Sequence, residues 1–175
     1  MPQTKEALIT ERTHDPVHHA SYSFEPDGEN LFVDTWLGPG GALPTHKHPR
    51  QEERWSVVDG EVLFRLGNTR RVIGPADGEL IVAPHTVHGL RATSDREVHL
   101  RCHVVPALGL RDFLEDSAAA AREGLFMKGG VPKSLRGARW AAGFLATHRD
   151  DVVMTFPPDF AQRAMIGLFG GSRLR

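Results

Sequence analysis

The stretch of sequence that decides the fold runs from residue 40 to residue 60 and reads G-G-A-L-P-T-H-K-H-P-R-Q-E-E-R-W-S-V-V-D-G. His46 and His48 stand at positions i and i+2 of this stretch. Because alternate side chains of a β-strand point to the same face, both imidazoles leave one face, about 6.6 Å apart along the backbone. This spacing predicts that both rings can reach one metal ion.

Glu53 and His88 complete a candidate set of metal ligands. Glu53 has the opposite parity to His48, but Pro49 stands between them. A proline cannot donate to a sheet ladder and it kinks the chain, so Glu53 can return to the face of the histidines. His88 lies beside a second apolar run that is bounded by turns. Three imidazoles and one carboxylate suit a divalent transition metal.

The composition limits the classes of function. The chain has 175 residues, of which 40% are hydrophobic and 25% are charged, so it can form one domain with a sizeable core. Its formal net charge is −1, and no basic run exceeds Arg70-Arg71. A chain without a basic cluster does not attract a polyanion, so we expect a small-molecule ligand or substrate and no nucleic-acid partner.

The cysteine content and the N-terminus bear on localisation. The single cysteine, Cys102, excludes an intramolecular disulfide and suits a reducing compartment. Residues 1–13 are polar and lack the apolar segment of a signal peptide. No stretch approaches the ~20 apolar residues of a membrane-spanning helix. We therefore expect a cytoplasmic protein with no membrane association.

Residues 30–106 are expected to be all-β, after an N-terminal arm at residues 1–29. Turn signals such as Asp59-Gly60 and Asp77-Gly78 separate short strand-like runs. Regular short strands with such turns indicate a β-sandwich or a barrel rather than alternating βαβ units. The predicted strands are 31–37, 53–58, 61–66, 70–73, 79–82, 86–91 and 97–105.

After Pro106 the apolar residues recur every three or four positions, which is the period of amphipathic helices. We predict one helix over 110–125, a second over 135–145 and a third over 160–168. Residues 107–175 therefore form a helical tail. We expect this tail to pack against the barrel or against a partner subunit rather than to form an independent domain.

The quoted stretch resembles the first motif of the cupin superfamily. That motif consists of a glycine, a His-x-His pair, a glutamate and a second glycine. Gly40, His46, His48, Glu53 and Gly60 match every fixed position of it with an allowed spacing.

The second cupin motif is matched in part. It consists of a glycine, a strand, a Pro-x-Gly turn and a histidine. Gly78 precedes a strand-like run, and His88 occupies the position of the histidine. Ala83 stands where the family has proline, and His85 stands where it has glycine. The departure concerns the turn rather than the ligand.

The resemblance implies a fold and a cofactor. The fold is an all-β core, a double-stranded β-helix or cupin jelly-roll barrel, over residues 30–106, with a C-terminal α-helical extension. The barrel would hold one divalent transition metal ion inside its wider mouth, and a chain of this size would form a homodimer. Fe, Mn, Ni, Cu and Zn all tolerate imidazole and carboxylate ligands. The implied metal ligands are His46, His48, Glu53 and His88.

The resemblance leaves three functions open. The first is a metal-dependent oxidoreductase of dioxygenase type that acts on a small organic oxygen compound, with Glu53 as a catalytic proton acceptor. The second is a metal-assisted isomerase or lyase with the same ligands. The third is a non-catalytic cupin that binds or senses a small molecule.

Four further residues are candidates for lining the substrate pocket. Trp55 shares the parity of Glu53, so it lines the pocket or belongs to the core. His99, Arg101 and His103 share one face of a strand and would bind an anionic or hydroxylated substrate if that face points inward. Otherwise, the apolar alternate residues of this strand form the inner face.

Overall fold

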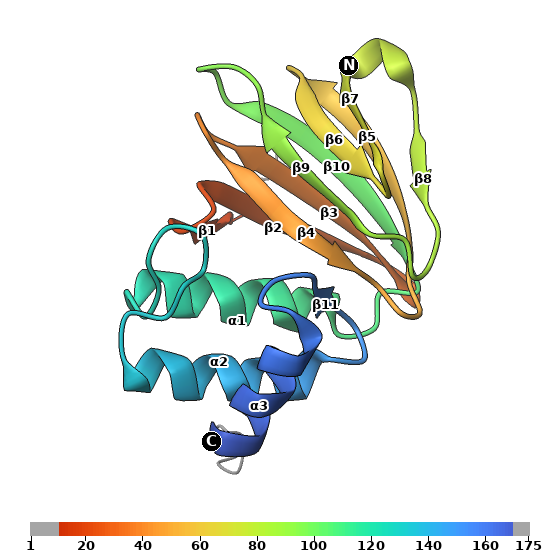
Figure 1. Cartoon of the computed structure of the whole chain (residues 1–175). Coiled ribbons are helices and arrows are strands. Elements are labelled where there is room, and N and C mark those ends of the chain that lie inside the picture. Colours follow the sequence, from red (N-terminus) through yellow and green to blue (C-terminus); the bar gives the residue numbers. More distant parts are fainter. Residues whose placement is uncertain (1–10, 170–175) are drawn as a thin grey trace.

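Two antiparallel sheets form the body of the protein, and three helices lie beneath them in the described chain (Figure 1). The computed structural model describes residues 11–169. One sheet has the strand order β1-β2-β3-β10-β5-β8 and the other β11-β4-β9-β6-β7. The chain alternates between the sheets, which is the predicted double-stranded β-helix. The strands are β1 (Thr13–Asp15), β2 (Ala20–Asp27), β3 (Asn30–Leu37), β4 (Ala42–Lys47), β5 (Glu52–Asp59), β6 (Val62–Leu66), β7 (Thr69–Ile73), β8 (Leu80–Val82), β9 (His88–Ala92), β10 (Val98–Val105) and β11 (Val153–Met154), with a short 3-10 helix at Pro75–Asp77.

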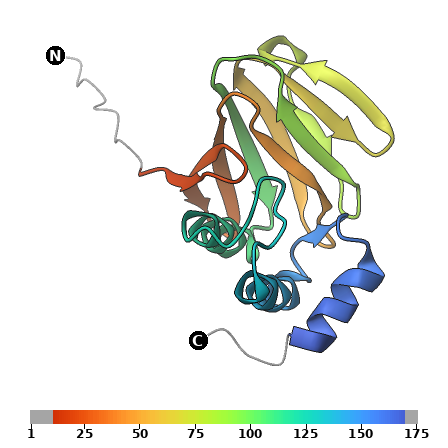
Figure 2. The ribbon, with the colours of Figure 1, turned by 60° about the vertical axis from the view of Figure 1, so that its left-hand side comes forward.

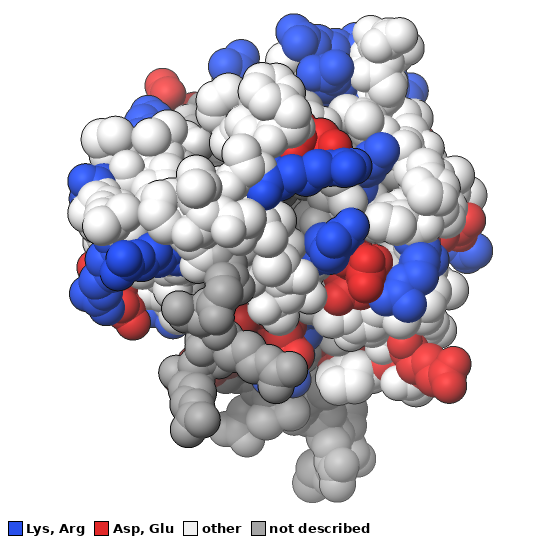
Figure 3. All heavy atoms as spheres, turned by 60° about the horizontal axis from the view of Figure 1, so that its bottom comes forward, with Lys and Arg blue, Asp and Glu red and all other residues white. Residues whose placement is uncertain are grey.

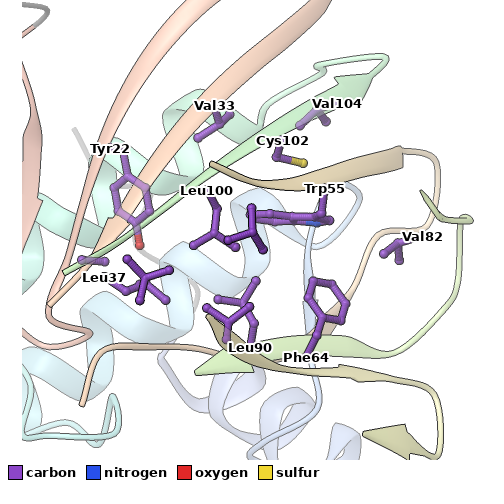
Figure 4. Packing of buried hydrophobic residues seen from close by; sticks show 14 of the residues in the cluster. Tyr22, Val33, Leu37, Trp55, Phe64, Val82, Leu90, Leu100, Cys102 and Val104 are labelled. Atoms are coloured by element: carbon purple, nitrogen blue, oxygen red, sulfur yellow. The ribbon is translucent and has the colours of Figure 1, made fainter. Parts of the chain in front are cut away.

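The core lies between the two sheets. Burial alternates residue by residue along β3 and β10, which pair over most of their lengths. Trp55, Phe64, Leu90 and Leu100 fill the space between the sheets (Figure 4). Burying one large apolar side chain stabilises the fold by about 1.5–3 kcal/mol, so this alternation fixes which face of each strand points inward.

The N-terminal segment differs from the predicted arm. Strand β2 pairs with β3 along its whole length, from Ala20 opposite Leu37 to Asp27 opposite Asn30. Strand β1 then pairs with β2 at the edge of the same sheet. Polar residues and histidines dominate this part of the sequence, so the alternation of apolar residues that indicates a strand is not recognisable there. Of the predicted arm, residues 1–10 lie outside the described residues.

The predicted helices are present as α1 (Leu110–Arg122), α2 (Leu135–His148) and α3 (Asp159–Phe169). The Ser134 hydroxyl accepts a hydrogen bond from the Gly137 N–H at 3.2 Å and so caps the start of α2. Figure 2 shows the helices gathered below one end of the barrel. Within the described residues the tail thus packs on its own barrel, and residues 170–175 lie outside them.

Strand β11 joins the tail to the barrel. It extends the smaller sheet by pairing with β4, with Val153 opposite Lys47 and Met154 opposite His46. The Thr155 N–H also donates to the carbonyl of Thr45 at 3.1 Å. The tail is therefore attached to the strand that carries the first predicted metal ligand.

The surface below the helices carries mixed charges. Figure 3 views this side of the molecule, where Lys, Arg, Asp and Glu are scattered among uncharged residues and no extended basic area is visible. Over residues 11–169, none of the helices has the length and apolar character that crossing a membrane requires.

Candidate metal centre

The structure brings the four predicted ligands together at the tail end of the barrel. His46 lies on β4, His48 directly follows it, Glu53 lies on β5, and His88 begins β9. One ligand atom from each residue lies within 4.8 Å of the other three. His48, Glu53 and His88 are buried and His46 is partly exposed, so the cluster sits below the surface with one accessible side.

A close approach of β4 and β9 places two of these histidines opposite each other. His46 and His88 are paired residues, and the register shifts between Leu43 and His46. A Cβ atom at Gly89 would lie 3.0 Å from the Leu43 carbonyl oxygen, which is too close for an ordinary van der Waals contact. Glycine therefore permits the contact between these strands, and the shift turns His46 toward His88.

Hydrogen bonds to backbone carbonyls orient all three imidazoles. The Nδ1 atom of His46 lies 2.7 Å from the Pro44 carbonyl oxygen, and that of His88 lies 3.0 Å from the Thr86 carbonyl oxygen. The Nδ1 atom of His48 lies 2.8 Å from the carbonyl oxygen of Asp151. A carbonyl can only accept, so each Nδ1 is the protonated nitrogen. In the neutral ring each Nε2 then carries a lone pair, as a metal ligand requires.

Glu53 faces two of these lone pairs. Its Oε1 lies 3.1 Å from His48 Nε2, and its Oε2 lies 2.8 Å from His88 Nε2. Despite these short distances, neither Nε2 atom has an aligned hydrogen-bond partner among the described residues. Buried nitrogen lone pairs that face carboxylate oxygens require a cation between them. The donor set therefore fits a divalent transition metal.

The pKa directions of His46 and Glu53 agree with this interpretation, whereas that of His48 follows the charge of Glu53. Burial, followed by the charges of His88 and His48, lowers the pKa of His46 to about 3, so this ring is neutral at pH 7. Burial alone would raise the pKa of Glu53, but His48 and His88 hold it well below its usual value. Burial opposes the charge on His48, yet the Glu53 carboxylate raises its pKa overall.

Gln51 and the tail support His48 from behind. The Gln51 side chain is 1% exposed, and its Oε1 lies 2.9 Å from His48 Nδ1. Its Nε2 donates to the carbonyl of Ala107. The Asp151 carbonyl is the second acceptor near His48 Nδ1, and it belongs to the segment between α2 and β11. The sequence indicated neither Gln51 nor Asp151 as a partner of His48. For Asp151 the reason is that no local pattern relates residues 48 and 151.

The departure from the family turn has a structural explanation. His85 adopts a φ of +66°, the left-handed conformation that a glycine adopts readily. Its backbone N–H donates to the carbonyl of His48 at 2.7 Å. The turn therefore keeps its shape and holds the backbone beside a ligand, while the His85 side chain is exposed.

A chamber of about 440 Å³ lies between the barrel and the helices. His46 and Glu53 form part of its wall at the metal centre. Most of the remaining wall is apolar and comes from both the barrel and the tail. The tail residues in this wall include Leu110, Phe113, Leu114, Phe126, Trp140, Phe144, Val152, Met154 and Phe156. The volume and the apolar wall suit a small organic molecule.

Trp55 takes the predicted place beside the metal centre. Its ring is 4% exposed and contributes to the chamber wall, and its Nε1–H donates to Glu53 Oε2 at 2.9 Å. Trp55 therefore both fills the core and orients the Glu53 carboxylate. Cys102 lies nearby in the same wall, and burial, with the charge of Glu53, raises the pKa of its thiol well above the usual value. The thiol is thus protonated and a poor nucleophile.

The prediction that His99, Arg101 and His103 line the substrate pocket is not supported. The apolar alternate residues of β10 point inward, so these three side chains lie on the outer face of the sheet. There His99 pairs with Asp34 at 2.8 Å and His103 with Asp27 at 3.1 Å. The aliphatic alternates bury more apolar area, and this decides which face is inside. The chamber wall contains none of the three.

Comparisons with known proteins agree with this architecture. The family model described as "Cupin domain" matches residues 35–105. A cupin from Shewanella frigidimarina, described as RmlC-like, is 22% identical; the match covers 62% of this chain and 94% of that one, with a TM-score of 0.51. A conserved protein with a double-stranded β-helix domain from Klebsiella pneumoniae is 22% identical; the match covers 51% of this chain and 79% of that one, with a TM-score of 0.47. A predicted oxalate decarboxylase from Thermotoga maritima is 16% identical; the match covers 59% of this chain and 97% of that one, with a TM-score of 0.49. The comparison with curated proteins gave no match.

The family match identifies residues 35–105, which are less than half of the chain, as similar to a cupin domain. At 22% identity and a TM-score of 0.51, the Shewanella frigidimarina cupin shares the fold of the barrel, and this likeness does not transfer an activity.

Proposed function

We propose that this protein is a metal-dependent oxidoreductase of dioxygenase type that acts on an apolar organic compound with an oxygen donor. The observation that carries the proposal is the placement of the metal centre. Three imidazoles and Glu53 converge at one point in the wall of an apolar chamber. Four protein ligands leave up to two positions free on a six-coordinate ion, and His46 and Glu53 reach the chamber wall.

A bound metal would polarise a substrate oxygen and would supply redox chemistry if it is Fe, Mn, Ni or Cu. The chain's own residues perform the other tasks. The apolar wall excludes water and orients the substrate. Glu53 would accept a proton from a substrate hydroxyl that a bound metal has made more acidic; its carboxylate is held ionised by His48 and His88, and is too weak a base to deprotonate a free hydroxyl. Trp55 fixes the Oε2 atom of Glu53 during this transfer.

A metal-assisted isomerase or lyase would use the same ligands, with the proton returned to another atom of the substrate. One observation favours a third function, a non-catalytic protein that binds or senses a small molecule. Apart from the metal ligands, the Asp, Glu and His residues of the chamber wall within the described chain are Asp15 and His18, which pair with each other at 2.7 Å, so neither is free to act as an acid or base on a substrate. A sensor would release no product, so assays of turnover separate it from both enzymes.

The first test is the metal content of protein purified without a polyhistidine tag, compared with that of two variants. His88→Ala removes a predicted ligand, whereas His85→Ala removes an exposed imidazole three positions away. We expect about one equivalent of metal in the wild type and in His85→Ala, and a loss of it in His88→Ala. Wild-type protein that contains no metal and takes up none on reconstitution would refute the proposal.

Oxygen uptake then separates an oxidoreductase from the other functions. The metal-loaded protein is screened with phenolic and dicarbonyl compounds while dissolved oxygen is recorded. Consumption of oxygen with product formation supports the oxidoreductase. Product without oxygen consumption supports an isomerase or lyase, and a rise in melting temperature without product supports a sensor.

A further inference from the structure

The tail contributes a continuous aromatic surface to the chamber. Four aromatic side chains that line the chamber belong to the tail, namely Phe113, Phe126, Trp140 and Phe144. The Trp140 and Phe144 rings are stacked, with their centroids 4.7 Å apart. Phe126 meets Trp140 at 5.5 Å, and Phe113 meets Phe144 at 4.8 Å. The four rings therefore form one cluster, which we call the aromatic wall.

Part of the aromatic wall is open to a ligand. Phe113, Phe126 and Trp140 are partly exposed, although each of them packs against another ring. The chamber itself reaches solvent, because two further residues that line it, Val131 and Phe156, are 42% and 68% exposed. A ligand can therefore enter the chamber and lie against these rings.

An aromatic surface discriminates between ligands of the same size. Aromatic rings attract one another in offset-stacked and edge-to-face arrangements, beyond the gain from burying their area. A saturated ring gains only from the burial of its area. The aromatic wall therefore favours an aromatic ligand, and a chamber of about 440 Å³ is large enough for two fused rings.

The charges in the chamber wall restrict the ligand further. Among the described residues the wall contains no lysine or arginine. Its carboxylates belong to Asp15 and Glu53, and its histidines are His18, which pairs with Asp15 at 2.7 Å, and the predicted metal ligand His46. A negative charge that leaves water without meeting a cation is strongly disfavoured. Away from the metal centre, the chamber therefore suits an uncharged molecule.

We propose that the substrate is an uncharged aromatic compound of about two fused rings, whose rings lie against the aromatic wall while an oxygen donor reaches the metal centre. This inference rests on the proposed function, because it assumes that a metal holds the oxygen donor. It makes Phe126 and Trp140 residues that determine specificity. It also disfavours compounds that carry a carboxylate away from the metal-bound oxygen.

Two alcohols with the same carbon skeleton test the aromatic wall. Naphthalen-2-ylmethanol is aromatic, and decahydronaphthalen-2-ylmethanol is its saturated counterpart, with the same oxygen donor. Both are titrated calorimetrically into protein loaded with Zn²⁺, which is not redox-active. The quantity compared between proteins is the ratio of the two affinities, because the saturated compound leaves water more readily than the aromatic one.

Variants assign the aromatic preference to the wall. Trp140→Leu and Phe126→Leu keep an apolar side chain and remove a ring, and each should lower the ratio about two- to tenfold. Trp140→Phe keeps a ring and should retain most of the ratio, which separates the loss of stacking from altered packing. Trp36→Leu is the matched control, because Trp36 is also partly exposed and stacks on His99 at 4.6 Å, but does not line the chamber.

A second pair of probes tests the exclusion of charge. A methylsulfonyl group or a sulfonate is placed on the ring of naphthalen-2-ylmethanol that lacks the alcohol. The two groups have similar shapes and differ by one negative charge, and a sulfonate is too weak a metal ligand to displace the alcohol. We expect the neutral sulfone to bind about tenfold more tightly, or better. Equal affinities would overturn the restriction to uncharged compounds.

The outcomes are distinguishable from failure of the proposed function. A Zn²⁺ titration precedes the probes, and absence of Zn²⁺ binding would overturn the metal centre itself. With Zn²⁺ bound normally, a ratio that is unchanged in both Trp140→Leu and Phe126→Leu would overturn only the aromatic wall. The same conclusion follows if neither alcohol binds, or if Trp36→Leu lowers the ratio as much as Trp140→Leu does.

Discussion

Replacement of Gln51 by leucine tests how far the surroundings of the metal centre determine metal affinity. Gln51 is buried, accepts from His48 Nδ1 at 2.9 Å, and donates to the Ala107 carbonyl. Leucine occupies a similar volume but offers no hydrogen bond. The variant therefore removes one of the two acceptors that orient a ligand, and it leaves the carbonyl of Ala107 without its donor.

The structure sets the size of both effects. Loss of a group that orients a metal-binding histidine lowers metal affinity by about 10- to 100-fold. The Asp151 carbonyl remains 2.8 Å from His48 Nδ1, so we expect the lower end, about tenfold. The unpaired carbonyl of Ala107 should reduce the free energy of unfolding of the metal-free protein by about 1–3 kcal/mol.

The assay is a Zn²⁺ titration in competition with a chromophoric chelator, with urea unfolding measured in parallel. Gln162→Leu is a matched control, because Gln162 is also buried and donates to the carbonyls of Met154 and Pro157 without touching a predicted ligand. The control should lose stability and keep its Zn²⁺ affinity. An unchanged affinity in Gln51→Leu, with stability reduced, would refute the reasoning and leave Gln51 as a structural tether alone.

Three further predictions concern other parts of the molecule. Gly137→Ala should reduce the free energy of unfolding by about 1–3 kcal/mol, because its Cβ would lie 2.6 Å from a backbone carbonyl oxygen. Gly167→Ala should raise the free energy of unfolding by about 0.5–1 kcal/mol, because this helical glycine has room for a Cβ, with nothing within 4 Å of it. Burial alone would raise the pKa of Asp15, but His18 and neighbouring N–H groups lower it overall. The difference in stability between wild type and Asp15→Asn should therefore be full above about pH 4 and should shrink as the pH falls further. Urea unfolding at pH 7 and pH 3 would show equal differences if the Asp15–His18 pair contributes nothing. Arg101→Ala, on the outer face of β10, should leave the Zn²⁺ affinity unchanged, and a weaker affinity in the same titration would return this residue to the site.

The sequence predicts the sheets well because two local signals agree. Alternating burial, as in β10, and turns such as Asp59-Gly60 coincide with the observed strand ends. Strand β2 gave no such signal, since its last three residues, Glu25 to Asp27, are exposed and include a proline, and only pairing with β3 makes this segment a strand. The direction in which the tail packs is likewise a tertiary property that no periodicity encodes.

The metal centre was predictable for a similar reason. Three of its residues come from one short stretch, and the fourth follows a recognisable turn, so spacing alone brings them together. The parts of the site that escaped prediction depend on contacts between distant segments. His48 meets the Asp151 carbonyl across 103 positions of the chain.

The attachment of β11 to β4 links two equilibria, the docking of the tail on the barrel and the binding of a metal by the four candidate ligands. The same segment that closes the chamber through Val152 and Met154 also supplies the carbonyl that orients His48. Undocking of this segment therefore opens the chamber and weakens a metal ligand in one event. Thermodynamic reciprocity then requires that a compound that holds the tail in place tightens metal binding by the same factor by which the metal tightens binding of that compound. Under the proposed function, metal loading and substrate retention would be two measurements of a single coupling energy.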